Sequence, residues 1–279
     1  MSSQNRIKRY IIFAKRLLYS FFRIFVNSGI EGMYNGPKIF ANSIPKSGTF
    51  LLQRVLYNMP KMRFAGTRTL RKHLHSKNYI KKKISSLKNG QYQMAHVDYN
   101  SEIAKLIEEN NIKSILIIRD PRQIIISHYK YVSYIDTTHP INDYFKSLKD
   151  DNERIMAVIN GIPGIVEPIE DILNSYVGWM NDKNTLVVKF EDLIGEKGGG
   201  SDFSQHETIK NIYKHVDISL NISKIKEIAN KVFDTKSPTF RSGNVKSWNS
   251  QFSDKHKRIL KNKIGSWLIE YGYEEKLDW

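Results

Sequence analysis

The sequence predicts an α/β protein in which a central, mostly parallel sheet is flanked by helices within a single main domain. Apolar runs such as residues 113–118 are continuous rather than alternating, which is typical of strands buried on both faces of a parallel sheet. These runs alternate along the chain with helix-like segments, as expected of a parallel α/β sheet. A chain of 279 residues, of which 40% are hydrophobic, can also bury the core that such a fold needs.

The first 30 residues predict a basic amphipathic helix, separate from a main domain over residues 31–279. On a helix, Lys8, Lys15 and Arg23 would share one face, with phenylalanine, leucine and isoleucine residues on the other. Charges interrupt the apolar run, so it is unsuited to span a bilayer. It suits a helix that lies on an anionic membrane surface, or one that packs on the domain itself.

The segment 43–49 reads Ser-Ile-Pro-Lys-Ser-Gly-Thr and lies between a strand-like and a helix-like apolar run. A strand that turns through small residues into a helix presents backbone N–H groups to an anion. Lys46 adds a positive charge, and Ser47 and Thr49 add hydroxyl donors. The lysine precedes Gly48, whereas in the Walker A loop it follows the second glycine. The segment therefore predicts a phosphate- or sulfate-binding loop other than that of ordinary NTPases.

The remaining elements follow in the order that the fold class requires. Strands are expected at residues 92–97, 113–118 and 185–190, and helices at 102–110, 123–134, 169–180, 207–214, 223–233 and 254–271. A glycine-rich loop at 195–201 and a polar loop at 236–253 connect the later helices. No domain boundary is expected after residue 30.

The net charge of +16 is distributed unevenly. Residues 61–90 contain ten lysines or arginines and no aspartate or glutamate. Such a block indicates either an anionic neighbour or a solvated basic face. The chain has no cysteine, which excludes disulfides, thiolate nucleophiles and cysteine-ligated zinc and is typical of a cytoplasmic protein.

Two further motifs could bind anions. Arg119 follows the strand-like run 113–118, and Ser127 lies two turns into the next predicted helix. An arginine fork and a hydroxyl at that separation can hold a phosphate at the carboxyl end of a strand. The alternative is a structural arginine–aspartate pair that caps the strand–helix turn. Further along, a loop with Arg241 could close over an anion, or could simply be a basic loop.

Together, the three motifs resemble the sulfotransferases that use 3′-phosphoadenosine 5′-phosphosulfate (PAPS), including cytosolic-type and bacterial members. Segment 43–49 resembles the 5′-phosphosulfate loop of that family, and Arg119 and Ser127 match its 3′-phosphate pair. Segments 240–248 and 190–193 resemble its Phe-Arg-Lys-Gly-x-x-Gly-x-Trp and Tyr-Glu-Asp-Leu elements. The resemblance extends from about residue 38 to the end of the chain and implies a P-loop-like PAPS site. The residues that it assigns to that site are Lys46, Ser47, Gly48, Thr49, Phe50, Arg119, Ser127, Phe240, Arg241, Ser242 and Gly243.

Four positions depart from the family pattern. Ser242 stands in place of a lysine, and Lys246 in place of the second glycine. Phe50 follows Thr49 where many members have threonine or serine, and Phe190 replaces the tyrosine. These changes predict altered cofactor affinity rather than loss of the transfer chemistry.

The resemblance points to His96 as the catalytic base, because the catalytic histidine of the family lies in a strand-end segment between the first two motifs. Imidazole titrates near neutral pH and can take the proton of an acceptor hydroxyl. In the implied reaction, that hydroxyl attacks sulfur in line while Lys46 offsets the charge on the departing phosphate. No metal is expected to take part.

Other functions fit parts of the sequence. A Mg²⁺-dependent small-molecule kinase would share the strand–loop–helix arrangement but would need metal ligands. A non-enzymatic binder of anionic membranes or nucleic acid would explain the charge, although no nucleic-acid module is recognisable. For a sulfotransferase, the basic segment 61–90 predicts an acidic acceptor such as a uronate-bearing glycan or a glycolipid, while a neutral phenol or alcohol would also be compatible.

Overall fold

The computed structural model describes residues 34–64, 68–136, 139, 141–233 and 247–279, together with Ala14 and Leu18. The chain divides into two compact units, one taken from residues 1–118 and 177–243 and the other from 119–176 and 244–279. The predicted N-terminal helix, apart from Ala14 and Leu18, lies outside the described residues. So do four residues assigned to the cofactor site, namely Phe240, Arg241, Ser242 and Gly243.

The first unit contains a sheet with the strand order β2-β4-β1-β5-β6. The strand β2 pairs with the start of β4, and β3 pairs with the end of β4. The strands are β1 (Lys38–Ser43), β2 (Arg63–Phe64), β3 (Leu70–Arg71), β4 (Gln91–His96), β5 (Ile112–Ile118) and β6 (Thr185–Lys189). Each strand pairing in the described part of the chain is parallel. The predicted α/β class with a central parallel sheet is therefore confirmed.

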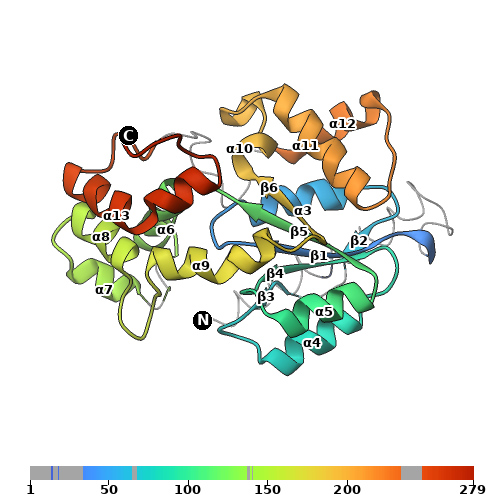
Figure 1. Cartoon of the computed structure of the whole chain (residues 1–279), viewed down its shortest axis with the longest axis horizontal. Coiled ribbons are helices and arrows are strands. Elements are labelled where there is room, and N and C mark those ends of the chain that lie inside the picture. Colours follow the sequence, from blue (N-terminus) through green and yellow to red (C-terminus); the bar gives the residue numbers. More distant parts are fainter. Residues whose placement is uncertain are drawn as a thin grey trace. The chain divides into compact units, whose positions relative to one another are not determined.

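Helices cover both faces of this sheet (Figure 1). Those of the first unit are α3 (Thr49–Asn58), α4 (Lys77–Ser85), α5 (Ser101–Glu109), α10 (Phe190–Leu193), α11 (Asp202–His215) and α12 (Ile222–Val232). Figure 1 shows α3, α11 and α12 on one side of the sheet and α4 and α5 on the other. Parallel strands need crossover connections, and α3, α4 and α5 lie in three of them, between β1 and β2, β3 and β4, and β4 and β5.

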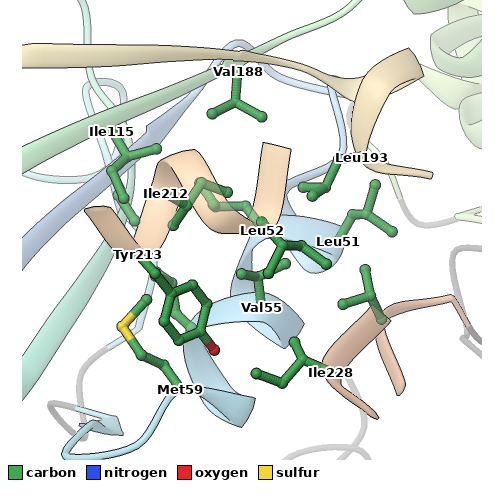
Figure 2. Close-up of a cluster of buried hydrophobic side chains, with 14 of the residues drawn as sticks. Leu51, Leu52, Val55, Met59, Ile115, Val188, Leu193, Ile212, Tyr213 and Ile228 are labelled. Carbon is green, nitrogen blue, oxygen red and sulfur yellow. The ribbon is translucent and has the colours of Figure 1, made fainter. Parts of the chain in front are cut away.

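The largest hydrophobic core of the first unit lies between the sheet and α3, α11 and α12 (Figure 2). Leu52 and Val55 on α3 are fully buried against Ile115 of β5 and Ile212 of α11. Burying a leucine or valine side chain contributes about 1.5–3 kcal/mol. The core thus fixes α3, and with it the loop that enters α3, against the strands.

The second unit is helical. It contains α6 (Pro121–Tyr134), α7 (Asn142–Ser147), α8 (Asp151–Asn160) and α13 (Asp254–Glu270), while α9 (Ile169–Met180) contributes residues to both units. Asp120 caps α6 by accepting a hydrogen bond from Arg122 N at 2.9 Å. Pro121 occupies the first turn of α6, where a missing N–H costs nothing.

A buried arginine organises this unit. The Arg122 guanidinium is bound by Asp120 and Glu274, and its Cζ lies 4.0 Å from the ring centre of Trp248 and 4.6 Å from that of Trp279. Its side chain is only 3% exposed, so the two carboxylates and the two indole rings replace its water. This cluster joins the start of α6 to the C-terminal residue of the chain.

Most sequence-based boundaries agree with the structure to within a few residues, but some elements were not expected. The strand expected at 185–190 ends at Lys189, because Phe190 begins the short helix α10. The strands β2 and β3 and the helices α4, α7 and α8 were not predicted. None of the helices in the described ranges combines the length and apolarity that crossing a bilayer demands.

Candidate active site

The candidate site lies at the carboxyl edge of the sheet, where open α/β folds bind their ligands. After β1, the chain turns through residues 44–48 and enters α3. Lys46 adopts φ 71° and Gly48 adopts φ 100°, both in the left-handed region. Ser47 N donates to Ile44 O at 3.1 Å and closes the turn. The small and left-handed residues of this segment therefore build the tight strand–loop–helix connection that the sequence predicts.

The loop has the features of an anion site. Ser47 is fully buried, and its Oγ has no hydrogen-bond partner in the described part of the chain. The backbone N–H groups of Thr49 and Phe50 open α3 and find no acceptor among the described residues, and the first turn contains no acidic side chain. A buried hydroxyl without a partner is costly unless a ligand binds it. These donors fit a phosphate or phosphosulfate group.

Phe190 explains why Gly48 is a glycine. A Cβ atom added to Gly48 would lie 2.5 Å from Phe190 Cδ2, closer than real Cβ contacts come. Phe190 begins α10 directly after β6, in the segment that resembles the Tyr-Glu-Asp-Leu element. The aromatic ring thus packs against the anion loop and holds the turn in place.

His96 is joined to this loop through Ser43. The last residue of β1, Ser43, lies beside the last residue of β4, His96, because the two strands pair in parallel. His96 Nδ1 lies 2.9 Å from Ser43 O and 3.0 Å from Ser43 Oγ, and Ser43 Oγ lies 2.8 Å from Thr49 Oγ1. A carbonyl oxygen can only accept, so Nδ1 carries the proton and donates it to Ser43 O. The other ring nitrogen, Nε2, is then free to accept a proton.

The electrostatic environment keeps His96 neutral. Burial, together with the positive charges of Arg71, His73 and Lys46, lowers the pKa of His96 to about 4, against an opposing effect of the hydrogen bond to the Ser43 carbonyl. At neutral pH the imidazole is therefore uncharged, which is the form that can act as a base.

The backbone beside His96 is clamped by buried polar groups. Asn42 Nδ2 donates to Val97 O at 2.7 Å, and Val97 N donates to Asn42 Oδ1 at 3.0 Å. Trp179 Nε1 donates to the same Val97 carbonyl at 3.0 Å. Asn42, Val97 and Trp179 are all nearly inaccessible to solvent. The clamp fixes the end of β4 against β1, so the imidazole of His96 is held in one position relative to the loop.

The other predicted residues are placed as follows. Phe50 is on the first turn of α3 and is 45% exposed. Arg119 directly follows β5, and Ser127 lies within α6, both in the second unit. An arginine–aspartate pair is present at the turn between β5 and α6, where Arg122 binds Asp120.

Comparison with known proteins places this geometry in context. A family model described as "Sulfotransferase domain" matches residues 36–272. A search of curated proteins found no match.

Solved structures show the same fold at low sequence identity. The mouse sulfotransferase SULT7A1 complexed with PAP is 22% identical, with a TM-score of 0.62, over 88% of this chain and 95% of that chain. Retinol dehydratase, solved with androsterone and the inactive cofactor PAP, is 13% identical, with a TM-score of 0.54, over 86% of this chain and 83% of that one. A complex of retinol dehydratase with retinol and PAP gives 13% identity, a TM-score of 0.55 and the same coverage.

Proposed function

The chain belongs to the sulfotransferase family, and we propose that it transfers a sulfuryl group from PAPS to an acceptor hydroxyl. The observation that carries this proposal is the hydrogen-bonded series Thr49–Ser43–His96, which joins an anion-binding loop to a neutral imidazole within one rigid sheet edge. Membership of the family is the reason for proposing PAPS as the donor. Proteins of similar fold have been solved with PAP, the product that remains of PAPS after transfer.

The loop after β1 and the residues that match the family motifs are proposed to bind the donor, PAPS. The buried hydroxyl of Ser47 and the N–H groups of Thr49 and Phe50 would bind the 5′-phosphosulfate. Arg119 and Ser127 are proposed to bind the 3′-phosphate, an assignment that rests on their match to the family pattern. Phe240, Arg241, Ser242 and Gly243 are proposed to contact the donor on the same grounds.

The proposed chemistry uses two side chains of the first unit. His96 Nε2 takes the proton of the acceptor hydroxyl as the hydroxyl oxygen forms its bond to sulfur. The bond between sulfur and the bridging phosphate oxygen breaks, and its electron pair stays on the phosphate. Lys46 stabilises the charge that develops on that oxygen. The acceptor becomes a sulfate ester, and PAP is released.

The proposed acceptor is acidic, such as a uronate-bearing glycan or a glycolipid. Helix α4 and the segment before it expose several cations of the basic segment 61–90, among them Arg71, Lys77 and Lys82. Only part of this charge is neutralised within the described residues, by Asp98 and Glu102. A surface with excess positive charge beside the base favours acceptors that carry negative charge.

Isothermal titration with PAP and with ADP tests the donor assignment. We expect PAP to bind without Mg²⁺ and more tightly than ADP, because only PAP carries the 3′-phosphate. Incubation with radiolabelled PAPS and a panel of acidic glycans, glycolipids and phenols then identifies the acceptor. Activity that requires Mg²⁺ and ATP would instead indicate a kinase. Steeply salt-dependent binding to nucleic acid without transfer would indicate a binding protein.

Residues 1–30 are proposed to lie on an anionic membrane surface, in a cytoplasmic protein whose acceptor is membrane-proximal. The charge pattern of the sequence is the support for this proposal. Co-sedimentation with anionic and with neutral vesicles tests it, and a chain that lacks residues 1–30 serves as the control. Equal sedimentation of both chains would refute the membrane role.

A further inference from the structure

Arg71 lies beside the candidate base on a neighbouring strand. The short strand β3 pairs with β4 in parallel, with Leu70 opposite Ala95 and Arg71 opposite His96. Residues that are partners in register project from the same face of a sheet. Lys72 N donates to His96 O at 3.3 Å, which extends the pairing by one step. Arg71 and His96 are therefore neighbours on one face.

The three side chains form a row across the sheet edge. Ser43 ends β1, His96 ends β4 and Arg71 ends β3, and β1 and β3 pair with opposite sides of β4. The anion loop with Lys46 continues from the Ser43 side of the row. A group bound at His96 would thus have the loop on one side and Arg71 on the other.

The backbone around Arg71 is held firmly. Leu74 N and His75 N both donate to Arg71 O at 3.1 Å, and Arg71 N donates to His75 Nδ1 at 3.1 Å. Next to it, Lys72 Nζ forms an ion pair of 2.7 Å with Asp98 Oδ2. The Arg71 side chain itself is exposed, and none of the ion pairs described for this chain neutralises it. The guanidinium of Arg71 is therefore available to bind a carboxylate in its planar, two-donor geometry.

Electrostatic coupling supports the same geometry. The charge of Arg71 lowers the pKa of His96, and Arg71 and Lys72 likewise lower the pKa of His73. Positive charge is therefore concentrated at the β3 end of the row. The charge of Arg71 disfavours protonation of His96. An anionic acceptor bound to Arg71 would offset this charge, raise the pKa of His96 and so make it a stronger base when the acceptor is in place.

We propose that Arg71 binds a carboxylate of the acceptor, next to the hydroxyl that is sulfated. The inference rests on the proposed function and narrows its acceptor class to sugar acids with a hydroxyl close to the carboxylate. A guanidinium binds a carboxylate through two parallel N–H···O bonds, which fixes orientation as well as position. Arg71 is then a specificity-determining residue, and the row Ser43–His96–Arg71 sets the distance between the hydroxyl and the carboxylate.

A matched pair of acceptors tests this directly. Phenyl β-glucuronide and phenyl β-glucoside differ in having a carboxylate or a hydroxymethyl group on the sugar. With radiolabelled PAPS, wild type should have a kcat/KM for the glucuronide higher by about tenfold or more, as expected for one charge-assisted contact. Arg71→Ala should remove this preference, so that the two sugars have about the same kcat/KM, and should leave PAP binding unchanged.

Lys82→Ala is the matched control, because Lys82 is another exposed cation of the same basic segment but lies on α4. It should keep the preference for the glucuronide. Equal losses of the glucuronide preference in the Lys82 and Arg71 variants would overturn the proposal. The basic segment would then attract the acceptor only through its total positive charge. The proposal is also overturned if wild type shows no preference, or if it binds PAP and sulfates neither sugar. Failure of wild type to bind PAP would overturn the proposed function itself.

Discussion

The protonation of His96 gives a quantitative test of the site. Burial and the neighbouring positive charges lower the pKa of His96 to about 4 from an ordinary value of 6.5. Because the unfolded chain takes up this proton below pH 6.5 and the folded chain does not until about pH 4, acid favours unfolding. The stability associated with the neutral imidazole is present above pH 6.5 and is lost as the pH falls toward 4. The neutral imidazole contributes about 3 kcal/mol to the free energy of unfolding, and about 2 kcal/mol of this contribution is lost by pH 5.

Comparing wild type with His96→Gln isolates this contribution, since all other titrating groups are common to both proteins. Urea unfolding at pH 7 and at pH 5 gives the free energy of unfolding of each. We expect wild type to lose about 2 kcal/mol relative to the variant between the two pH values. An NMR titration, assigned with the same variant, should show the His96 ring still neutral at pH 5. A stability gap that does not change with pH, or a ring that titrates near 6.5, would refute the described environment of His96.

Three further substitutions follow from the geometry. Lys46→Ala should lower the single-turnover rate of transfer by about a hundredfold or more, as loss of a charge-stabilising group does, and a change confined to the acceptor KM would argue against its role. Ser43→Ala removes the hydroxyl between Thr49 and His96 but keeps the carbonyl that fixes the tautomer of His96. The kcat of this variant should therefore fall by only about fivefold. A loss of kcat as large as that caused by removing His96 would show that the carbonyl does not orient the ring. Arg122→Ala removes the guanidinium that binds the buried Asp120 carboxylate and should cost about 3–5 kcal/mol in urea unfolding. The control Lys146→Ala removes an exposed pair with Asp143 and should cost under about 1 kcal/mol. Equal costs for the two variants would contradict the importance of the buried cluster.

The sequence was informative where local pattern decides structure. The continuous apolar run of β5 is buried on both faces, so its hydrophobicity alone identifies it. The loop after β1 was predictable because its small residues and its glycine are needed by the turn itself. By contrast, β3 has only two residues, and it is a strand only because β4 lies beside it. Nothing within those two residues marks them as a strand.

The sequence predicted the residue types of the candidate site but not their contacts. The loop was named from its residue pattern, and His96 from the resemblance to the sulfotransferases. The role of Ser43 could not be predicted, because it depends on the register between β1 and β4, about fifty residues apart. Arg71 was one of ten cations in a basic block, and only its pairing with His96 distinguishes it from the others. An arginine–aspartate pair was foreseen at the turn after β5, but only the structure shows that Arg122 forms it with Asp120.

The most direct test of the proposed mechanism is transfer of radiolabelled sulfate from PAPS by wild type and by His96→Ala, with PAP binding measured on the same preparations. We expect the variant to lose transfer by about 10²–10⁴-fold or more, as for removal of a general base, and to bind PAP as wild type does. The donor contacts are assigned to the loop and to the family motifs, and His96 makes none of them. Near-normal transfer by the variant would contradict the assignment of His96 as the base.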